Sequence, residues 1–285
     1  MREKTINILR QAKAEGRAVG AFNSFNLEMT QAIVRAAVET AQPCIVQVTT
    51  TSFGYAGIPT LGEVVETVIK RESAEVPIGF HLDHGKTFED IVKAIEAGVD
   101  SVMIDASKKE LAENIALTKQ VVEYAHQRGV AVQAELGRVP SIGPDGRSVE
   151  SWEEIMTNPE EAKSLVVATG VDALAVGIGN AHGFFPEREE PDWARLEEIR
   201  KQIPGIPLII HGASDWDRTK VEEAIKRGIT CFNVDTDLRL TFIEASCRQL
   251  GPDCDLTDPR TALGAARQAV QEKVQEKILL YKLAE

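Results

Sequence analysis

The chain has 285 residues, of which 43% are hydrophobic and 27% are charged, and this composition excludes disordered and collagen-like proteins. Its net charge of −12 and the lack of a basic stripe argue against a nucleic-acid partner. No apolar run reaches the roughly 18 residues of a transmembrane helix, so no membrane partner is expected. The charged N-terminus lacks the apolar core of a secretory signal. The four cysteines form no CxxC pair, so we expect reduced thiols and a cytoplasmic protein.

Short apolar runs alternate with helical patterns along the whole chain. Eight runs read as strands buried on both faces, at 19–22, 44–50, 76–82, 99–105, 130–136, 171–177, 206–212 and 229–234. Apolar residues at i, i+3 and i+4 predict a helix over 61–69. A second such pattern begins at Val221, after an N-cap candidate at Asp217. Further helices are predicted over 27–42, 87–97, 110–129, 159–169, 191–203 and 236–250.

This alternation predicts an α/β protein, a (β/α)8 TIM barrel that occupies residues 1–285 as one domain. A doubly wound sheet is the structural alternative. That fold usually carries a glycine-rich phosphate turn after its first strand, whereas the turn here reads AFNSFN. Amphipathic segments at 2–16 and 260–283 predict an extra N-terminal helix and a C-terminal helical extension. They could cap the barrel or form a subunit contact.

Four of the five histidines fall at or just beyond the C-terminal ends of three predicted strands: His81, His84, His182 and His211. In a barrel these ends share one face, where active sites are built. Imidazole is the commonest zinc ligand, and three protein ligands with an open position make a catalytic site. The pattern therefore predicts a divalent-metal site. A hydrogen-bonded core or loop histidine is the alternative for any single one, and His126 is expected on the surface.

Carboxylates join the histidines at the same predicted rim. They are Asp83 within HLDHG, Asp105, Glu135, Asp235 and Asp237. Carboxylates beside histidines orient metal ligands, hold a second cation or move protons. For Asp235 and Asp237, an N-cap of the following helix is the alternative.

Small polar turns follow the seventh and eighth predicted strands, HGAS at 211–214 and NVDT at 233–236. In barrels, these two loops often bind phosphate through backbone N–H and hydroxyl groups. The pair predicts an anionic substrate, and simple tight turns are the alternative.

The order and spacing of six motifs resemble the class II, zinc-dependent ketose-bisphosphate aldolases, which include fructose- and tagatose-bisphosphate aldolases. The motifs are HLDHG (81–85), SVMIDAS (101–107), AELGR (134–138), GNAHG (179–183), HGAS (211–214) and NVDTDLR (233–239). The resemblance extends from AFNSFNLE to the DPR at 258–260. It implies reversible retro-aldol cleavage of a ketose or keto-sugar derivative, with a phosphorylated one favoured, through an enediolate that zinc stabilises.

The resemblance also implies roles for individual residues. Asp83 matches the catalytic acid/base, and the implied zinc ligands are His84, His182 and His211. Positions that contact a second or alternative metal, or a monovalent cation, are His81, Asp105 and Glu135. The substrate-phosphate pocket matches Gly183, Gly212, Ser214, Asn233, Asp235 and Thr236. Candidates for substrate specificity are Asn23, Thr49, Arg188, Asp215 and Arg260. Arg260 matches an arginine that meets the distal phosphate in some members, which implies a homodimer or homotetramer.

Three predicted substrate loops depart from the family pattern. The stretch after AELGR lacks the usual Glu-Asp pair, whose Glu serves a second proton transfer. After AHG, Arg188 is the only base where a lysine often stands, and Asp215 replaces the glycine that usually follows HGAS. A carboxylate beside a phosphate is unfavourable, so we expect an altered substrate and poor activity on fructose 1,6-bisphosphate. Loop drift, with Asp215 capping the next helix, is the alternative.

Two other functions fit part of the pattern. A metal-dependent epimerase or isomerase, or an aldolase of a non-phosphorylated sugar acid, would use the same barrel and metal. A non-catalytic sugar-binding protein could keep a structural zinc, but it would make Asp83 unnecessary. Retro-aldol products separate aldolases from epimerases, and metal-dependent turnover excludes the non-catalytic protein.

Overall fold

Eight parallel strands close into one barrel in the computed structural model, which describes residues 1–139, 155–181, 190–251 and 256–282. Each strand pairs with the next in chain order, and the eighth pairs with the first. The strands are β1 (Val19–Asn23), β2 (Cys44–Thr49), β3 (Ile78–Gly85), β4 (Ser101–Ile104), β5 (Ala131–Leu136), β6 (Ala173–Val176), β7 (Leu208–Ile210) and β8 (Ile229–Val234). The predicted (β/α)8 fold is confirmed.

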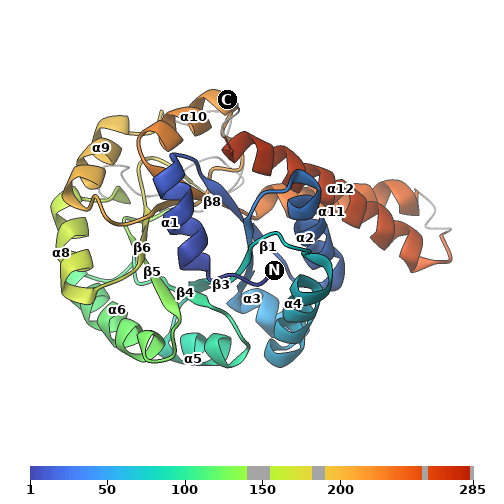
Figure 1. The fold of residues 1–285 in the computed structure, drawn as a ribbon, viewed down its shortest axis with the longest axis horizontal. Helices are drawn as coiled ribbons and strands as arrows, with labels where there is room; N and C mark the ends of the chain where they lie inside the picture. The colour runs from blue at the N-terminus through green and yellow to red at the C-terminus, as the bar shows by residue number, and fades with distance from the viewer. Residues whose placement is uncertain (140–154, 182–189, 252–255, 283–285) are drawn as a thin grey trace.

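Helices surround the barrel, as Figure 1 shows. They are α1 (Thr5–Glu15), α2 (Leu27–Thr40), α3 (Thr50–Ala56), α4 (Ile58–Glu72), α5 (Phe88–Glu96), α6 (Leu111–His126), α8 (Pro159–Thr169), α9 (Trp193–Gln202), α10 (Arg218–Lys226), α11 (Thr236–Leu250) and α12 (Pro259–Tyr281). The expected terminal helices are α1 and α12. Helix α3 was not predicted, because Gly54 and its threonines favour no helix. It forms because Thr49 caps its first turn and Phe53 is buried.

Side-chain caps fix where several helices begin. Asn26 accepts a hydrogen bond from the backbone N–H of Met29, and Thr87 forms a capping box with Asp90. Asp217 caps α10, as the sequence predicts. These caps set the lengths of the loops that leave the strands, and so they position the residues at the barrel rim.

The terminal helices attach to the barrel in different ways. The apolar face of α1 packs against the barrel and closes one end, where Ile8 and Leu9 belong to one buried apolar cluster with strand residues such as Ile209. This is the capping role that the sequence left open. Helix α12 packs along α2 and α11, and together α11 and α12 form an arm that projects from the barrel (Figure 1).

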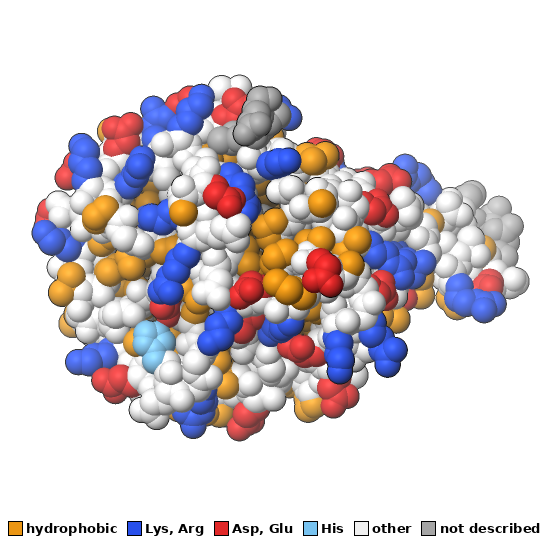
Figure 2. All heavy atoms as spheres, in the orientation of Figure 1, with side chains coloured by type: hydrophobic (Ala, Val, Ile, Leu, Met, Phe, Trp, Pro, Cys, Tyr) orange, Lys and Arg blue, Asp and Glu red, His pale blue; other side chains and the backbone are white. Residues whose placement is uncertain are grey.

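The surface is mixed in charge. Figure 2 shows acidic and basic side chains interspersed over the viewed face, without a basic stripe there. None of the helices in the described ranges is long and apolar enough to cross a membrane.

Replacement of Gly62 by alanine is expected to destabilise the fold, because a Cβ at this buried position of α4 would collide with the carbonyl oxygen of Ala97. We expect a loss of about 1–3 kcal/mol in the free energy of unfolding, measured by urea denaturation. The control is Gly54→Ala in α3, where a Cβ has open space and helix propensity favours alanine. Equal stabilities of the two variants would contradict this packing.

Candidate active site

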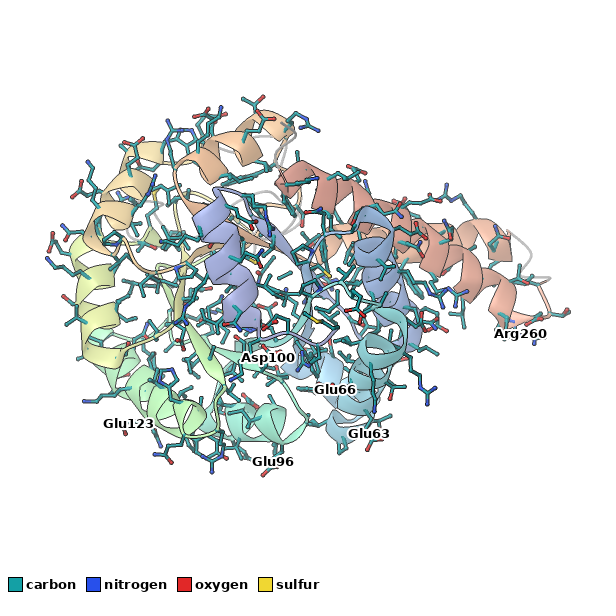
Figure 3. All side chains as sticks on the ribbon, viewed as in Figure 1. Glu63, Glu66, Glu96, Asp100, Glu123 and Arg260 are labelled. Atoms are coloured by element: carbon teal, nitrogen blue, oxygen red, sulfur yellow. The ribbon has the colours of Figure 1, made fainter. Side chains whose placement is uncertain are left out.

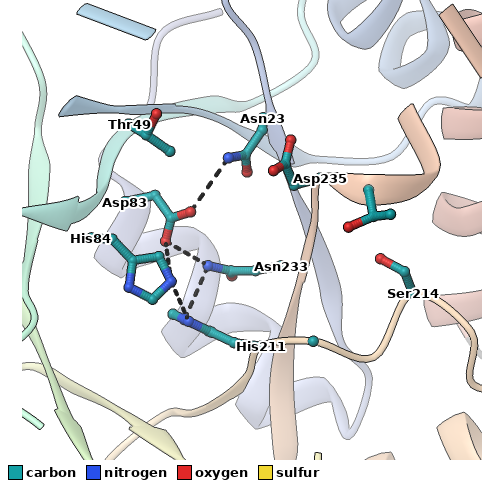
Figure 4. A pocket seen from close by; sticks show the side chains of 10 residues that line it. Asn23, Thr49, Asp83, His84, His211, Ser214, Asn233 and Asp235 are labelled. Atoms are coloured by element: carbon teal, nitrogen blue, oxygen red, sulfur yellow. Dashed lines mark hydrogen bonds and ion pairs between the residues drawn. The ribbon is translucent and has the colours of Figure 1, made fainter. Parts of the chain in front are cut away.

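The C-terminal strand ends surround a cavity of about 90 Å³ (Figure 4). Its lining comprises Asn23, Thr49, Asp83, His84, His211, Gly212, Ser214, Asn233, Asp235 and Thr236. A second cavity of about 1160 Å³ shares part of this lining, so the two cavities adjoin. The small cavity is the inner end of a much larger recess.

The end of β3 has an unusual backbone. His84 has a φ of 51°, in the left-handed region that non-glycine residues rarely adopt, and the pairing with β4 shifts register between Leu82 and Gly85. A side chain at Gly85 would approach the backbone of Met103 too closely, so only glycine fits there. The irregularity places Asp83 and His84, neighbours in sequence, in the lining of the same cavity.

Two histidines from distant strands face each other in this cavity. The Nε2 atom of His84 lies 3.1 Å from the Nδ1 atom of His211, and the rings meet edge to face. His211 is fully buried, and Asn180 donates a hydrogen bond of 2.8 Å to its backbone carbonyl. The strand end and this hydrogen bond together hold His211 in place.

Carboxylates surround the histidine pair. Asp105 Oδ2 lies 3.2 Å from Nδ1 of His84, and Glu135 Oε2 lies 3.4 Å from Nδ1 of His211. Asp83 Oδ1 is 3.8 Å from Nε2 of His84. The site therefore concentrates negative charge around two imidazoles, as a cation site requires.

This charge arrangement shifts the proton affinities of the groups. Burial disfavours the charged form of His84, but Asp83, Asp105 and Glu135 outweigh it and raise the pKa of His84 to about 10. Burial raises the pKa of Glu135 to about 8. Burial also acts on Asp105, yet its hydrogen bond to His84 prevails and lowers the pKa of Asp105 to about 2. Such shifts are typical of functional sites.

Side-chain amides hold the carboxylate of Asp83. Asn233 donates to Oδ1 at 3.1 Å, while Asn23 and Gln47 donate to Oδ2 at 3.4 and 3.3 Å. Gln47 also donates to the side-chain oxygen of Asn23. Figure 4 shows Asn23 directed at one carboxylate oxygen of Asp83 and Asn233 directed at the other. The carboxylate is buried, held by neutral donors and adjacent to the cavity.

The donor set fits a divalent metal. Donor atoms of Asp83, His84 and His211 lie within 4.8 Å of one another. Two nitrogens bound tetrahedrally to one zinc at about 2.0–2.1 Å lie about 3.3 Å apart, close to the observed separation of the two histidines. Glu135 Oε2 is buried and, apart from its 3.4 Å approach to Nδ1 of His211, has no hydrogen-bond partner among the described residues, as expected of an oxygen that faces a cation site.

Most of the predicted substrate residues line the cavity. The alternative roles of Asp235 and Asp237 as N-caps of the following helix can be compared with their observed contacts. Gly212, Ser214 and Thr236 line the inner end. Asp235 stands at the N-cap position of α11, yet its side chain makes no capping bond and pairs with Arg239 at 3.1 Å. Asp237 lines neither cavity, and its ion pair with Lys277 takes it away from the site.

Other predicted residues lie elsewhere. His81 is buried 2.9 Å from Ser101 Oγ and lines neither cavity. Burial, together with the charge of His84, lowers the pKa of His81 to about 3. Asp215 lines neither cavity and does not cap α10, which Asp217 does.

The remaining predicted residues belong to the arm, to the segment after β6 and to α6. Arg260 lies at the tip of the arm (Figure 3), where its side chain is 89% exposed, and it lines neither cavity of its own chain. His182, Gly183 and Arg188 lie outside the described residues. His126 is exposed, as predicted, and lies 2.8 Å from Asp172.

Two glutamines of the site were missed from the sequence. Gln47 contacts Asp83, and Gln133 Nε2 lies 3.1 Å from Nε2 of His211. Each is a polar residue within an otherwise apolar strand, CIVQVTT and VAVQAEL. That interruption was the available signal, because a buried amide needs a polar partner.

Fold and site together define a (β/α)8-barrel enzyme whose rim pocket offers a donor set that could hold a metal ion. The family model for class II fructose-bisphosphate aldolase matches residues 3–285. Fructose-bisphosphate aldolases of Thermus caldophilus and Staphylococcus aureus (strain Mu50) are 40% and 39% identical, over 97% and 95% of this chain and 96% and 94% of theirs. The chain belongs to the class II fructose-bisphosphate aldolase family.

Solved structures agree with this assignment. The YdjI aldolase from Escherichia coli K12 has a TM-score of 0.85 at 30% identity, with 99% of this chain and 97% of that chain covered. A putative fructose-1,6-bisphosphate aldolase from Coccidioides immitis has a TM-score of 0.86 at 29% identity, with 98% and 96% covered. The protein is an aldolase, a carbon–carbon lyase of a metal-dependent family that serves carbohydrate metabolism.

The stability of the metal-free protein is expected to depend on His84. Its pKa is raised in the folded state, so the stabilisation is complete below the ordinary value of 6.5 and is lost as the pH rises through about 10. The free energy of unfolding should therefore fall over this range, and His84→Gln should reduce the fall, although Glu135, whose raised pKa of about 8 acts in the same direction, keeps part of it. Urea denaturation of chelator-treated protein at a series of pH values measures it.

His126→Gln, at an exposed site, is the control and should keep the wild-type pH dependence. The same slope in wild type and His84→Gln would show that the carboxylates do not stabilise a protonated His84.

Proposed function

We propose that the chain is a zinc-dependent aldolase that cleaves a phosphorylated ketose reversibly between C3 and C4, with residues 1–285 acting as one domain. The observation that carries this proposal is the position of Asp83. Its carboxylate lies beside the facing imidazoles of His84 and His211 and lines the same cavity. Proton transfer and cation binding are thereby available at one point, as a retro-aldol reaction requires.

His84 and His211 would hold the zinc, with His182 as the third ligand. A bound zinc supplies a Lewis acid that polarises the ketose carbonyl and leaves a position open for substrate. Asp83 takes the proton from the C4 hydroxyl as the C3–C4 bond breaks, and the electron pair of that bond stays on the ketose half, which a second acid must protonate at C3 before release. In the synthetic direction Asp83 returns its proton to the aldehyde oxygen. Asn23, Gln47 and Asn233 hold the carboxylate with three hydrogen bonds, which leaves one of its roughly four lone-pair sites for the hydroxyl proton.

Asp105 orients His84 in this proposal. With zinc bound, its carboxylate would accept from Nδ1 and so favour the tautomer in which Nε2, the nitrogen that faces His211, carries no proton. Asp105 and Glu135 remain the candidates for a second divalent or a monovalent cation, because both carboxylates line the larger cavity.

The substrate is proposed to carry an anionic group at each end. Gly212, Ser214 and Thr236 offer backbone N–H and hydroxyl groups to a phosphate at the inner end. The larger cavity is lined by five basic residues in a chain of net charge −12, namely Lys86, Lys108, Lys109, Arg138 and Arg239. Such a cluster favours a second anionic group on the aldehyde half.

A homodimer or homotetramer is proposed from the arm. Arg260 projects from its tip, where it is available to the site of a second copy rather than its own. On α11, Leu240 and Ile243 are 45% and 58% exposed, which suits a subunit contact. The free thiols of Cys44, Cys231 and Cys247 support a cytoplasmic enzyme.

Asp83→Asn is expected to lower kcat for cleavage by about 10²–10⁴, because the near-isosteric amide cannot accept the proton. Release of the aldehyde, followed with a coupled dehydrogenase, measures the rate. Metal content and melting temperature should match wild type. Near-normal turnover with intact fold would remove Asp83 from the mechanism.

Purified wild-type protein is expected to contain one tightly bound zinc per chain. His211→Ala should lose most of it, because His211 presents Nδ1 towards His84 from a fully buried position. His126→Ala, on the exposed end of α6, is the matched control and should keep its zinc. Elemental analysis and chelator competition measure both, and full zinc content in His211→Ala would refute this ligand assignment.

Fructose 1,6-bisphosphate is expected to be a poorer substrate than a ketose that differs at the phosphate end or in the aldehyde half. Asp215 lines neither cavity, but it adds a carboxylate directly after the cavity-lining Ser214, and Arg188 is the only base where a lysine often follows AHG. The measurement compares kcat/KM for bisphosphorylated, monophosphorylated and free ketoses in wild type and Asp215→Gly, with identification of both products. Highest activity on fructose 1,6-bisphosphate in wild type, unchanged in the variant, would make the loop changes neutral drift. Epimerised product without cleavage would refute the aldolase.

A further inference from the structure

A buried ammonium group lies behind the inner end of the cavity. Lys277 on α12 is 6% exposed, and its Nζ lies 2.7 Å from Asp237 Oδ2. The same Nζ donates a hydrogen bond of 2.9 Å to the backbone carbonyl of Ser214. Asp237 is itself largely buried, with 10% of its side chain exposed. Lysine is rarely buried this deeply unless its charge is paired, so the position is specific to a cation.

One partner of Lys277 belongs to the first of the two turns that form the inner cavity, and the other directly follows the second turn, at the start of α11. Ser214 is in the turn after β7 and lines the cavity. Asp237 directly follows Thr236, which lines the cavity from the turn after β8. Lys277 and Asp237 line neither cavity. One ammonium therefore connects the two turns from outside the substrate space.

Helix α12 holds Lys277 rigidly against the barrel. Tyr281, one helical turn further on the same face, stacks on Phe232 of β8 with ring centroids 4.7 Å apart. Its backbone carbonyl accepts a hydrogen bond from Ala18, next to β1. The end of α12 is thus fixed to the strand that leads into the second turn, and the reach of Lys277 sets where the first turn lies.

We propose that Lys277 is a positioning residue that fixes the two phosphate-binding turns relative to each other, and so determines the affinity for the substrate's inner phosphate. This rests on the phosphate role given to these turns in the proposed function. Without the ammonium, the Asp237 carboxylate and the Ser214 carbonyl would both be buried unpaired, and the turns would move to reach water. The backbone N–H groups that face the phosphate would move with them.

The test uses Lys277→Met, which keeps the aliphatic stem, and Asp237→Asn, which keeps the side-chain volume. Lys273→Met is the matched control, because Lys273 lies on the same helix and pairs with Glu276 at the surface. Calorimetry on the zinc-loaded protein measures the Kd of inorganic phosphate, and steady-state assays give KM and kcat for the best phosphorylated ketose. Melting temperature and zinc content are measured alongside.

We expect Kd for phosphate and KM to rise about tenfold in both variants, with kcat within about threefold of wild type and zinc content unchanged. Lys277→Arg should recover part of the affinity, and Lys273→Met should match wild type. A lower melting temperature with unchanged Kd and KM would show a purely structural ion pair and overturn the proposal. If Lys277→Met does not fold, an unchanged phosphate Kd in Asp237→Asn overturns it equally.

The wild type separates this proposal from the function on which it rests. If wild-type protein binds phosphate and cleaves a phosphorylated ketose, the variants decide the role of Lys277 alone. If wild-type protein does neither, the phosphate role of the turns is wrong and the positioning role falls with it.

Discussion

Closure of the parallel barrel is the constraint on which the site depends. Because every strand runs in the same direction, the C-terminal ends of β3 and β7 open onto one rim. His84 and His211 are 127 residues apart in the chain, yet their facing nitrogens are 3.1 Å apart. No local feature of either segment could produce this approach. Helix α1 supports it from the other end, where its apolar face closes the barrel interior.

The carboxylates at the barrel rim have different surroundings, and these suit them to different roles. Asp83 accepts hydrogen bonds from three neutral amides and faces the cavity. Glu135 is buried beside His211, and burial raises its pKa to about 8. Carboxylates placed in unlike environments take unlike roles in many enzymes. In this chain, Asp83 suits proton transfer, whereas Glu135 and Asp105 shape the charge around the histidines.

Much of the fold was predictable because it follows from periodic burial. Eight apolar runs, the helical patterns between them and the cap at Asp217 are local signals, and each corresponds to an observed element. The convergence of His84 and His211 followed once the barrel was inferred, since strand ends in a barrel share a face.

Other features could not be predicted because tertiary contacts create them. The left-handed backbone of His84 depends on a register shift against β4. His81 shares the HLDHG motif, but its side chain bonds Ser101 instead of lining the cavity. The pairing of Lys277 with Asp237 joins α12 to α11, and no sequence pattern indicates that these two residues meet. Interrupted apolar strands at Gln47 and Gln133 were readable signals of the polar interior.

The proposed catalysis depends on a zinc ion held by the facing histidines. Crystals of the protein purified without chelator, measured on both sides of the zinc absorption edge, test it directly. We predict one anomalous peak per chain, at about 2.0–2.1 Å from Nε2 of His84 and from Nδ1 of His211. A peak bound elsewhere, or zinc-loaded crystals with no peak between these two nitrogens, would contradict the account.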